Sequence, residues 1–189
     1  MTARPLGIPG PLLVEVRRFA DERGVFAETY SRRDFEAIGI ADDFVQDNAS
    51  LSRQPGTVRG LHFQAPPHAQ AKLVRVTRGA ILDVAVDLRR GSPHFGRHVA
   101  VALVAGDGRA LYVPAGFAHG FCTLERDTEV AYKASDFYAP DADGGVLWND
   151  PELGIDWPVA AHEAVLSDKD RRLPELHALP VAFPREGGR

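Results

Sequence analysis

The sequence predicts an all-β protein, a jelly-roll barrel with a few short helices. Short apolar or alternating segments recur at roughly even spacing between residues 12 and 133, separated by turns rich in Gly, Pro and Asp. No helical periodicity of any length interrupts this series, which argues against alternating β and α units. A chain of 189 residues suffices for one sizeable core, so we predict a single domain over 1–189 with its core at about 11–174. We expect the tail from Pro184 to Arg189 to be mobile.

Composition and charge narrow the class of protein. The formal net charge of −4 provides no basic field for a nucleic acid backbone. Cys122 is the single cysteine, so no intrachain disulfide can form and a reducing compartment is expected. Residues 1–11 show no apolar signal-peptide region, and the longest apolar run, Val99 to Ala105, is too short to span a bilayer. We therefore expect a soluble cytoplasmic protein without a nucleic acid or membrane partner.

The first predicted elements are two strands and one helix. Residues 12–18 and 25–30 are predicted as strands on either side of a turn at Asp21-Glu22-Arg23-Gly24. Ser31 is expected to open a short helix, and Gly39 to end it.

The next strand, residues 45–51, is unusually polar. Gln46, Asn48 and Ser50 fall on one side of it because side chains alternate between the two faces of a strand. This row either lines a cavity, where a ligand or water supplies hydrogen-bond partners, or faces solvent on an edge strand.

A histidine and an arginine lie three positions apart in the strand predicted at 58–64. Regular alternation places Arg59 and His62 on opposite faces, unless a bulge or bend intervenes at Gly60, where glycine permits one. His62 is then either a proton-transfer group beside an anion-binding arginine or a core histidine satisfied by a backbone carbonyl.

The cleanest alternation in the chain runs from Ala80 to Leu88. One face carries only aliphatic side chains, whereas Asp83 and Asp87 interrupt the other. We expect His62 or Lys72 as partners of Asp83, and solvent exposure for Asp87.

The remaining elements complete a β-rich chain. The stretch from Phe137 is rich in aromatics and turn residues and is predicted to be a lid over one end of the barrel. Ser167 is expected to cap a short helical turn. Further strands are expected at 72–77, from Pro93 to 105, at 111–113 and at 128–133.

The metal-binding pattern of cupins is incomplete in this sequence. Gly108, Pro114, Gly116 and His119 fit the second cupin motif, but the first motif would need two histidines one residue apart and then a carboxylate. The matching place reads His62-Phe63-Gln64, with Lys72 nearby, and an ammonium repels a divalent cation. We therefore expect neither a metal nor another cofactor. The remaining polar groups make an acid/base set, namely His62, Lys72, His119 and Tyr132.

The chain resembles the dTDP-4-dehydrorhamnose 3,5-epimerases, sugar-nucleotide epimerases of the cupin superfamily. The resemblance covers about residues 11–174 and keeps many segments in the family's order. They include Asp21-x-Arg23-Gly24-x-Phe26-x-Glu28, Gln46-x-Asn48-x-Ser50, Arg59-Gly60-Leu61-His62-Phe63-Gln64, Lys72-Leu73-Val74, Asp83-Val84-x-Val86-Asp87, Pro114-x-Gly116-Phe117-Ala118-His119-Gly120-Phe121 and Leu166-Ser167-x-Lys169-Asp170.

This resemblance implies a cupin-like jelly roll acting as a homodimer with exchanged N-terminal strands. It implies epimerisation of dTDP-4-dehydro-6-deoxy-D-glucose at C3 and C5, by proton removal alpha to the keto group and return on the other face. The product would be dTDP-4-dehydro-L-rhamnose. Such chemistry needs a base, an acid across the ring and a positive group at the enolate oxygen.

The resemblance also implies a role for each residue of the acid/base set. His62 would be the base, Asp170 would orient its imidazole, and Asp83 would be a second carboxylate in reach. Tyr132 would donate the proton on the far face, and Lys72 would stabilise the enolate. The residues alone leave simpler roles open, a satisfied buried phenol for Tyr132 and a surface-reaching chain for Lys72.

The resemblance implies that two arginines and residues near the first predicted turn bind the nucleotide. Arg59 and Arg23 would bind the pyrophosphate. Phe26 and Glu28 would reach the thymine region, either in this chain's site or in the partner's. Asp143 stands where many relatives have a glutamate, one methylene longer.

Other polar residues are implied around the sugar. Gln46 and Asn48 would hydrogen-bond the ligand, and His119 and Lys169 would complete the sugar and nucleotide pocket. Tyr138 is a candidate for the pocket wall.

Three other functions fit the same residues. Some members of the family epimerise a single carbon or act on related deoxysugars. A metal-dependent cupin oxygenase or isomerase would hold iron, manganese or zinc. A non-catalytic module would bind the sugar nucleotide without exchanging its protons.

Overall fold

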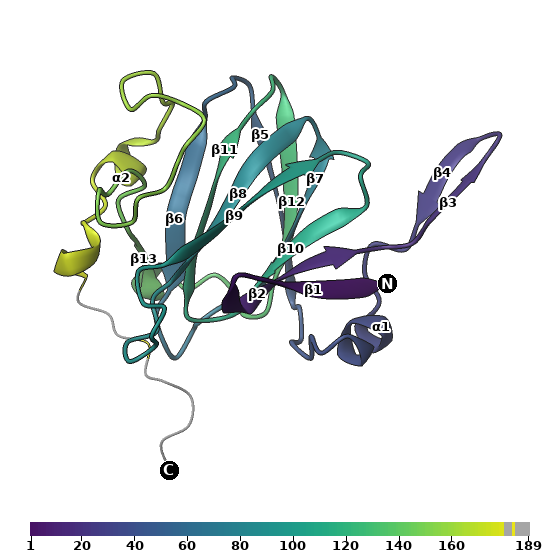
Figure 1. Cartoon of the computed structure of the whole chain (residues 1–189), viewed down its shortest axis with the longest axis horizontal. Helices are drawn as coiled ribbons and strands as arrows, with labels where there is room; N and C mark the ends of the chain where they lie inside the picture. Colours follow the sequence, from purple (N-terminus) through teal and green to yellow (C-terminus); the bar gives the residue numbers. More distant parts are fainter. Residues whose placement is uncertain (180–182, 184–189) are drawn as a thin grey trace, which may run out of the picture.

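A computed structural model describes residues 1–179 and 183. Two antiparallel sheets face each other, one of six strands in the order β1-β2-β10-β7-β12-β5 and one of five in the order β13-β6-β11-β8-β9 (Figure 1). Strands β3 and β4 form a separate two-stranded sheet. The predicted all-β class is confirmed. The tail predicted to be mobile, Pro184 to Arg189, lies outside the described residues.

The elements follow one another along the chain as short strands with few helical turns. Their bounds are β1 Thr2–Leu6, β2 Ile8–Glu15, β3 Arg18–Asp21, β4 Gly24–Ala27, α1 Arg32–Ala37, β5 Gln46–Ser52, β6 Val58–Gln64, β7 Lys72–Arg78, β8 Ala80–Asp87, β9 His98–Val104, β10 Arg109–Val113, β11 Phe117–Thr123, β12 Thr128–Ala134, the 3₁₀ turn Pro140–Ala142, β13 Asp143–Gly145, α2 Asp168–Arg171 and the 3₁₀ turn Leu176–Ala178.

The sequence does not predict β1, because prolines at positions 5, 9 and 11 suggest a loop. β1 is the edge strand of the six-stranded sheet, where a proline removes no hydrogen bond that a neighbouring strand needs. β2 also begins and ends earlier than the predicted 12–18, and Ile8 on it is buried in the core.

Both faces of the five-stranded sheet are buried. Its inner face packs on the other sheet through residues such as Ile81 and Ala85. Its outer face, which carries Val84 and Val86, is covered by the C-terminal segment, where Leu176 packs against it. Alternation in β8 is therefore confirmed, and the face with the two aspartates is the one directed into the barrel.

The expected solvent exposure of Asp87 is wrong. Its side chain is fully buried at the end of β8, where Arg89 Nη2 lies 2.7 Å from Oδ2 and the Ser92 hydroxyl donates to the same oxygen at 2.8 Å. Burial alone would raise the pKa of Asp87, but these bonds hold it below its usual value. The carboxylate is thus stable in the interior because the Arg89 guanidinium, 2.7 Å away, compensates for its desolvation.

The lid predicted from Phe137 is only partly correct. Trp148 and Trp157 pack together at 5.7 Å between ring centroids, with their planes tilted by 60°. They cover Val58 and Cys122 on the outer face of the five-stranded sheet, not an end of the barrel. The part that follows Phe137 directly does lie at an end, beside the last residue of β6, because Gln64 bonds to the backbone of Phe137 and Ala139.

Both predicted helices are present. Phe35 on α1 is buried against the outer face of the six-stranded sheet, although the Ser31 side chain makes no capping bond. In α2 the Ser167 hydroxyl accepts from the Asp170 backbone N–H at 3.1 Å, so Ser167 is the predicted N-cap.

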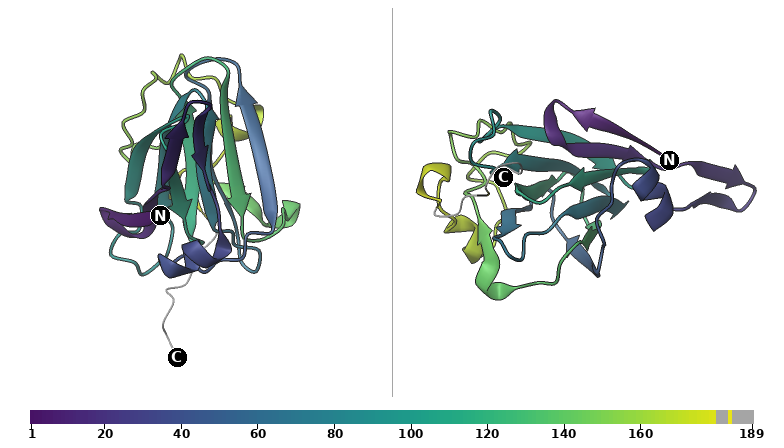
Figure 2. Two further views of the ribbon diagram at one scale, coloured as in Figure 1. Left: turned by 90° about the vertical axis from the view of Figure 1, so that its right-hand side faces the viewer. Right: turned by 90° about the horizontal axis from the view of Figure 1, so that it is seen from below.

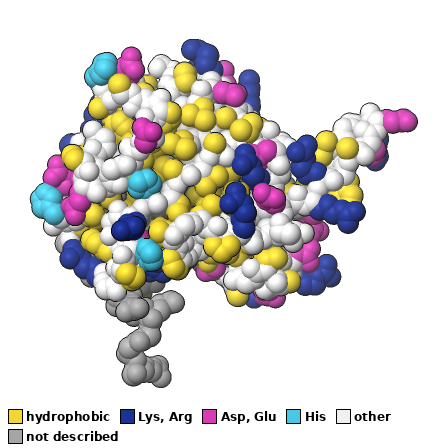
Figure 3. Space-filling model, viewed as in Figure 1, with side chains coloured by type: hydrophobic (Ala, Val, Ile, Leu, Met, Phe, Trp, Pro, Cys, Tyr) yellow, Lys and Arg dark blue, Asp and Glu magenta, His cyan; other side chains and the backbone are white. Residues whose placement is uncertain are grey.

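The β3–β4 hairpin projects away from the two main sheets (Figure 1 and the right-hand view of Figure 2). Phe26 on it is 70% exposed and Val25 57% exposed. Hydrophobic side chains are visible on its surface, with charged ones towards its tip (Figure 3). No helix within the described residues is long and apolar enough to cross a membrane.

Candidate active site

A bulge in β6 brings Arg59 and His62 to the same face. His62 pairs with His119 on β11 and Arg59 pairs with Phe121, so three steps along β6 match two steps along β11. Because directly paired residues point to the same side of a sheet, Arg59 and His62 both point inward.

Gly60 makes this bulge possible, as the sequence predicted. Its φ is +119°, and a Cβ there would lie 2.6 Å from the Gly120 Cα atom. A side chain would therefore meet the backbone of the neighbouring strand.

The opposite sheet presents its own polar side chains to the same interior. Tyr132 on β12 pairs with Val74 on β7, and Val74 is part of the core between the sheets. Lys72 lies two residues before Val74 and shares its face. Tyr132 and Lys72 thus face the sheet that carries His62.

These side chains border one cavity of about 500 Å³. It unites all four members of the acid/base set that the sequence predicted, with groups from both sheets, from α2 and from the segment before α2. Its lining is Ser50, Thr57, Val58, Arg59, His62, Lys72, His119, Phe121, Tyr132, Val165, Leu166, Ser167, Lys169 and Asp170.

His62 and Asp170 form a close pair. The His62 Nε2 atom lies 2.6 Å from Asp170 Oδ1, with the carboxylate almost fully buried and the imidazole partly open to the cavity. Burial would raise the pKa of Asp170, but the bond to His62, the Ser167 cap and the Gly60 N–H together lower it below its usual value. Asp170 is therefore an anion, and the alternative in which a backbone carbonyl satisfies His62 is wrong.

Asp83 is not the second carboxylate of His62. Its Oδ1 atom lies 2.7 Å from His119 Nε2, because β8 neighbours β11 and not β6. Asp83 is fully buried, and its Oδ2 atom has no hydrogen-bond partner among the described residues. The two histidines that line the cavity thus belong to separate histidine–aspartate pairs, and Asp83 itself lies outside the lining.

Lys72 is a buried amine with a perturbed pKa. Burial lowers the pKa to about 8, against the opposing effect of the Asp143 and Asp83 carboxylates, and Lys169 lowers it further. The amine lies 5.9 Å from the centroid of the Tyr132 ring. Because its ammonium is poorly solvated, it is suited to interact with a negative charge that develops in the cavity.

Tyr132 keeps its proton at neutral pH. Burial raises the pKa of its phenol, the Arg59 cation lowers it, and the Asp143 carboxylate raises it further, with a net upward shift. A neutral phenol inside the barrel is a proton donor rather than a base.

The polar strand β5 combines both predicted possibilities. It is the edge strand of its sheet, yet its polar row faces inward and is half-buried. Asn48 Nδ2 and Ser50 Oγ are buried without a hydrogen-bond partner in the described part of the chain. Such groups need a partner from solvent or ligand. Ser50 was not among the predicted site residues, although its place in the Gln46–Ser50 row was a sufficient signal.

Lys169, on the rim of the cavity, is linked to two other residues predicted to bind the ligand, which do not themselves line the cavity. Lys169 is ion-paired with Asp143, and the Tyr138 hydroxyl donates to the same Asp143 oxygen at 3.2 Å. Asp143, one methylene shorter than the family's glutamate, thus links Tyr138 to Lys169.

Seven of the predicted binding residues do not line the cavity within this chain: Gln46, Asn48, Tyr138 and Asp143 lie outside its lining, and the other three are at the hairpin. Arg23, Phe26 and Glu28 belong to or follow the projecting hairpin, and none of them borders the cavity. Arg23 pairs instead with Asp21 at 2.5 Å on the exposed hairpin.

Gln64, at the position of a cupin metal ligand, has a different role. It is buried and bonds to the backbone of residues 68, 137 and 139. No group of three or more His, Cys, Asp or Glu side chains within residues 1–179 and 183 is arranged to hold a metal ion. The donors present therefore do not fit a cupin metal centre.

Comparison with known proteins identifies relatives along almost the whole chain. The family model for dTDP-4-dehydrorhamnose 3,5-epimerase matches residues 5–178. A Sinorhizobium fredii (strain NBRC 101917 / NGR234) protein of that name is 50% identical over 184 residues, which is 97% of this chain and 93% of the relative.

Solved structures agree in fold. The dTDP-4-dehydrorhamnose 3,5-epimerase of Bacillus anthracis str. Ames, with TDP and PPi bound, is 53% identical with a TM-score of 0.85, over 87% of this chain and 93% of that one. The dTDP-6-deoxy-D-glucose-3,5-epimerase of Legionella pneumophila Philadelphia 1, in complex with dTDP-4-keto-L-rhamnose, is 39% identical with a TM-score of 0.91, over 98% of both chains. This chain belongs to the dTDP-4-dehydrorhamnose 3,5-epimerase family.

Proposed function

We propose that this chain epimerises dTDP-4-dehydro-6-deoxy-D-glucose at C3 and C5 to give dTDP-4-dehydro-L-rhamnose, a step of dTDP-rhamnose biosynthesis. One observation carries the proposal: His62 and Tyr132, on facing sheets, border the same cavity with Lys72 beside them. A base and an acid on opposite sides of a sugar ring can remove a proton from one face and return one to the other.

The base is His62, in a reaction that requires no metal. Its Nε2 is engaged by Asp170, so Nδ1 is the nitrogen left to accept the proton alpha to the keto group. The Asp170 carboxylate fixes the ring and stabilises the imidazolium that forms. The carbon–hydrogen bond breaks, and its electron pair moves into the enolate.

Lys72 stabilises that enolate. With a pKa of about 8 it is mostly protonated at neutral pH, and its buried position strengthens its attraction for an oxyanion. Tyr132 then gives its proton to the opposite face of the same carbon, and the enolate electron pair forms the new carbon–hydrogen bond. Before the second carbon reacts, the His62 imidazolium releases its proton to solvent and the Tyr132 phenolate takes one from solvent, so that base and acid are restored.

The binding roles follow from charge and position. Arg59 is suited to the pyrophosphate, because a guanidinium binds phosphate oxygens in bidentate fashion. The unpartnered polar atoms of Asn48 and Ser50 are suited to hydroxyl or carbonyl groups of the ligand.

Proton NMR in heavy water tests this function and separates the alternatives. Incubation of dTDP-4-dehydro-6-deoxy-D-glucose with the protein should introduce deuterium at both C3 and C5. Exchange at one carbon would identify a single-carbon epimerase, and dTDP binding without exchange would identify a non-catalytic module. Activity that is lost with a chelator and restored by a metal would support a metal-dependent cupin.

We also propose a cytoplasmic homodimer in which the N-terminal strands are exchanged. The projecting β3–β4 hairpin, with Phe26 70% exposed, supports it, since large apolar side chains at a surface indicate a partner. Arg23 and Glu28 would then serve the partner's cavity. The buried thiol of Cys122 is compatible with a reducing compartment.

Mixed dimers test the exchange. Arg23→Ala and His62→Ala subunits should each be inactive alone, whereas a mixed dimer should regain one intact site. That site combines His62 from one subunit with Arg23 from the other. Mixtures without recovered activity, or a monomer by light scattering, would exclude the shared site.

A further inference from the structure

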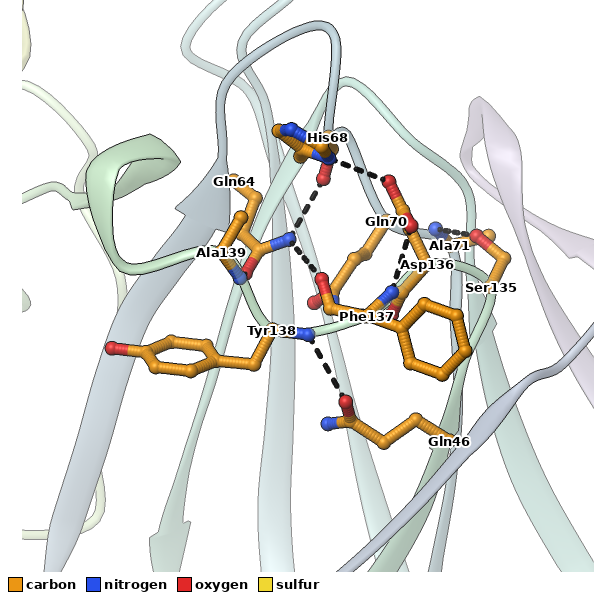
Figure 4. A network of polar contacts seen from close by, with 10 residues as sticks. All are labelled: Gln46, Gln64, His68, Gln70, Ala71, Ser135, Asp136, Phe137, Tyr138 and Ala139. Atoms are coloured by element: carbon orange, nitrogen blue, oxygen red, sulfur yellow. Dashed lines mark hydrogen bonds and ion pairs between the residues drawn. The ribbon is translucent and has the colours of Figure 1, made fainter.

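A buried glutamine holds the irregular segment that leaves β12. Gln64 donates from Nε2 to the carbonyls of His68 at 2.8 Å and Phe137 at 3.1 Å, and its Oε1 accepts from the Ala139 N–H at 2.8 Å (Figure 4). Its side chain is 4% exposed. Gln64 thus replaces the strand ladder that this segment lacks, since buried backbone groups must find partners.

Two other glutamines complete this support. Gln70 Nε2 donates to the carbonyl of Asp136 at 2.7 Å, and Gln46 Oε1 accepts from the Tyr138 N–H at 3.0 Å (Figure 4). Four consecutive residues, 136–139, are therefore each bonded to a glutamine side chain. The three glutamines come from β5, from the end of β6 and from the turn that follows it.

The segment held in this way carries two exposed aromatic side chains. Phe137 is 65% exposed and Tyr138 is 58% exposed. The Tyr138 hydroxyl donates to Asp143, which is ion-paired with Lys169, and Lys169 borders the cavity. A firmly held backbone under an exposed aromatic ring is not explained by core packing, because neither ring is in the core.

We propose that Gln64 is a positioning residue for ligand binding, and that it fixes Tyr138 at the rim of the cavity before the sugar nucleotide arrives. Fixing the ring in advance removes an ordering cost from the binding step. The inference rests on the proposed function for its substrate. Its own content is that Gln64, at the place of a cupin metal ligand, acts on affinity through the Tyr138 segment.

The experiment uses dTDP as the probe, so that it does not depend on turnover. Gln64→Leu keeps the side chain's bulk and removes three hydrogen bonds. We expect the Kd for dTDP, measured by calorimetry, to rise about tenfold, and KM to rise similarly with kcat within about twofold. Gln64→Glu should act in the same direction, because a carboxylate would face two carbonyl oxygens.

A double-mutant cycle with Tyr138→Ala distinguishes positioning from general stabilisation. Tyr138 is exposed, so its removal should leave the fold intact and weaken dTDP binding by itself. In the Tyr138→Ala background, Gln64→Leu should cost little further affinity. Independent, additive losses in the cycle would overturn the proposal, and so would an unchanged Kd in Gln64→Leu.

Gln54→Leu is the matched control. It is the same substitution, but Gln54 lies on an exposed turn and does not border the cavity. It should leave Kd unchanged. If wild-type protein binds dTDP without exchanging deuterium, the proposed function fails while the cycle still tests the positioning role.

Discussion

His62 and His119 lie directly opposite each other on β6 and β11, and the Nε2 atom of each faces a different aspartate. Asp170 lies 2.6 Å from His62, and Asp83 lies 2.7 Å from His119. The two pairs differ in their surroundings. The His62 side chain is 30% exposed towards the cavity, whereas that of His119 is 7% exposed. His62 is therefore the histidine that is more open to the cavity.

Replacement of His62 should remove catalysis and spare nucleotide binding. His62→Ala eliminates the base, so deuterium incorporation at C3 and C5 should fall by a factor of about 10³ or more. The affinity for dTDP should change less than threefold by calorimetry, because His62 serves the sugar ring. Unchanged turnover would refute the role of base. Asp170→Asn, which keeps the shape, should slow exchange to a smaller extent.

The phenol of Tyr132 is predicted to act in proton return. Tyr132→Phe keeps the ring that borders the cavity and removes the proton, so kcat for epimerisation should fall by about 10²–10⁴ while dTDP affinity is retained. Exchange of the abstracted proton with solvent should persist, since His62 remains. NMR spectra of samples quenched at successive times measure both the deuterium exchange and the formation of product. Equal losses in binding and turnover would contradict the donor role.

Lys72 should give the rate a basic limb near pH 8. Because burial depresses its pKa to about 8, the ammonium is lost as pH rises through that value, and kcat should decline there. In Lys72→Arg this basic limb should move to higher pH.

The same depressed pKa of Lys72 has an opposite effect on the stability of the fold. Since the unfolded chain holds this proton up to its ordinary pKa of 10.5, Lys72's contribution to stability should rise between pH 8 and 10.5.

Replacement of Asp83 should shift the basic limb of the pH–rate profile without removing a contact of His62. The Asp83 carboxylate raises the pKa of Lys72, so Asp83→Asn should move the basic limb of the kcat profile to lower pH. The other groups that act on Lys72 provide the comparison: Asp143→Asn should shift the limb in the same direction and Lys169→Met in the opposite one. A limb at the same pH in all three variants would show that another group titrates.

Gly60 should tolerate no side chain. Gly60→Ala places a Cβ 2.6 Å from the Gly120 Cα atom at a φ of +119°. The free energy of unfolding, measured in urea, should therefore fall by on the order of 3 kcal/mol. Activity should fall too, because the bulge aligns Arg59 with His62. Gly39→Ala is the control. Gly39 also has a positive φ, of +88°, but has open space around it, so its loss should be smaller.

Much of the site follows from the sequence alone. Alternation along β8 put Asp83 and Asp87 on one face, and Gly60 between Arg59 and His62 indicated where the strand could bulge. Gly108, Pro114, Gly116 and His119 fit the second cupin motif, but glutamine at position 64 and Lys72 nearby already argued against a metal centre. These features are local, because the alternation of side chains along a strand and the backbone conformations open to glycine do not depend on distant residues.

Only the tertiary structure decided which groups meet. His62 and Asp170 are 108 positions apart, and no local pattern indicates that Asp170, rather than Asp83, lies beside His62. The sequence also suggested that Asp87 is exposed to solvent, because the aliphatic face of β8 was expected to be the only buried one. It could not reveal that the C-terminal segment covers this aliphatic face, so that the face with Asp87 points into the barrel. Alternation specifies which side chains share a face, but when both faces are buried, sheet pairing and packing determine which face lines the cavity.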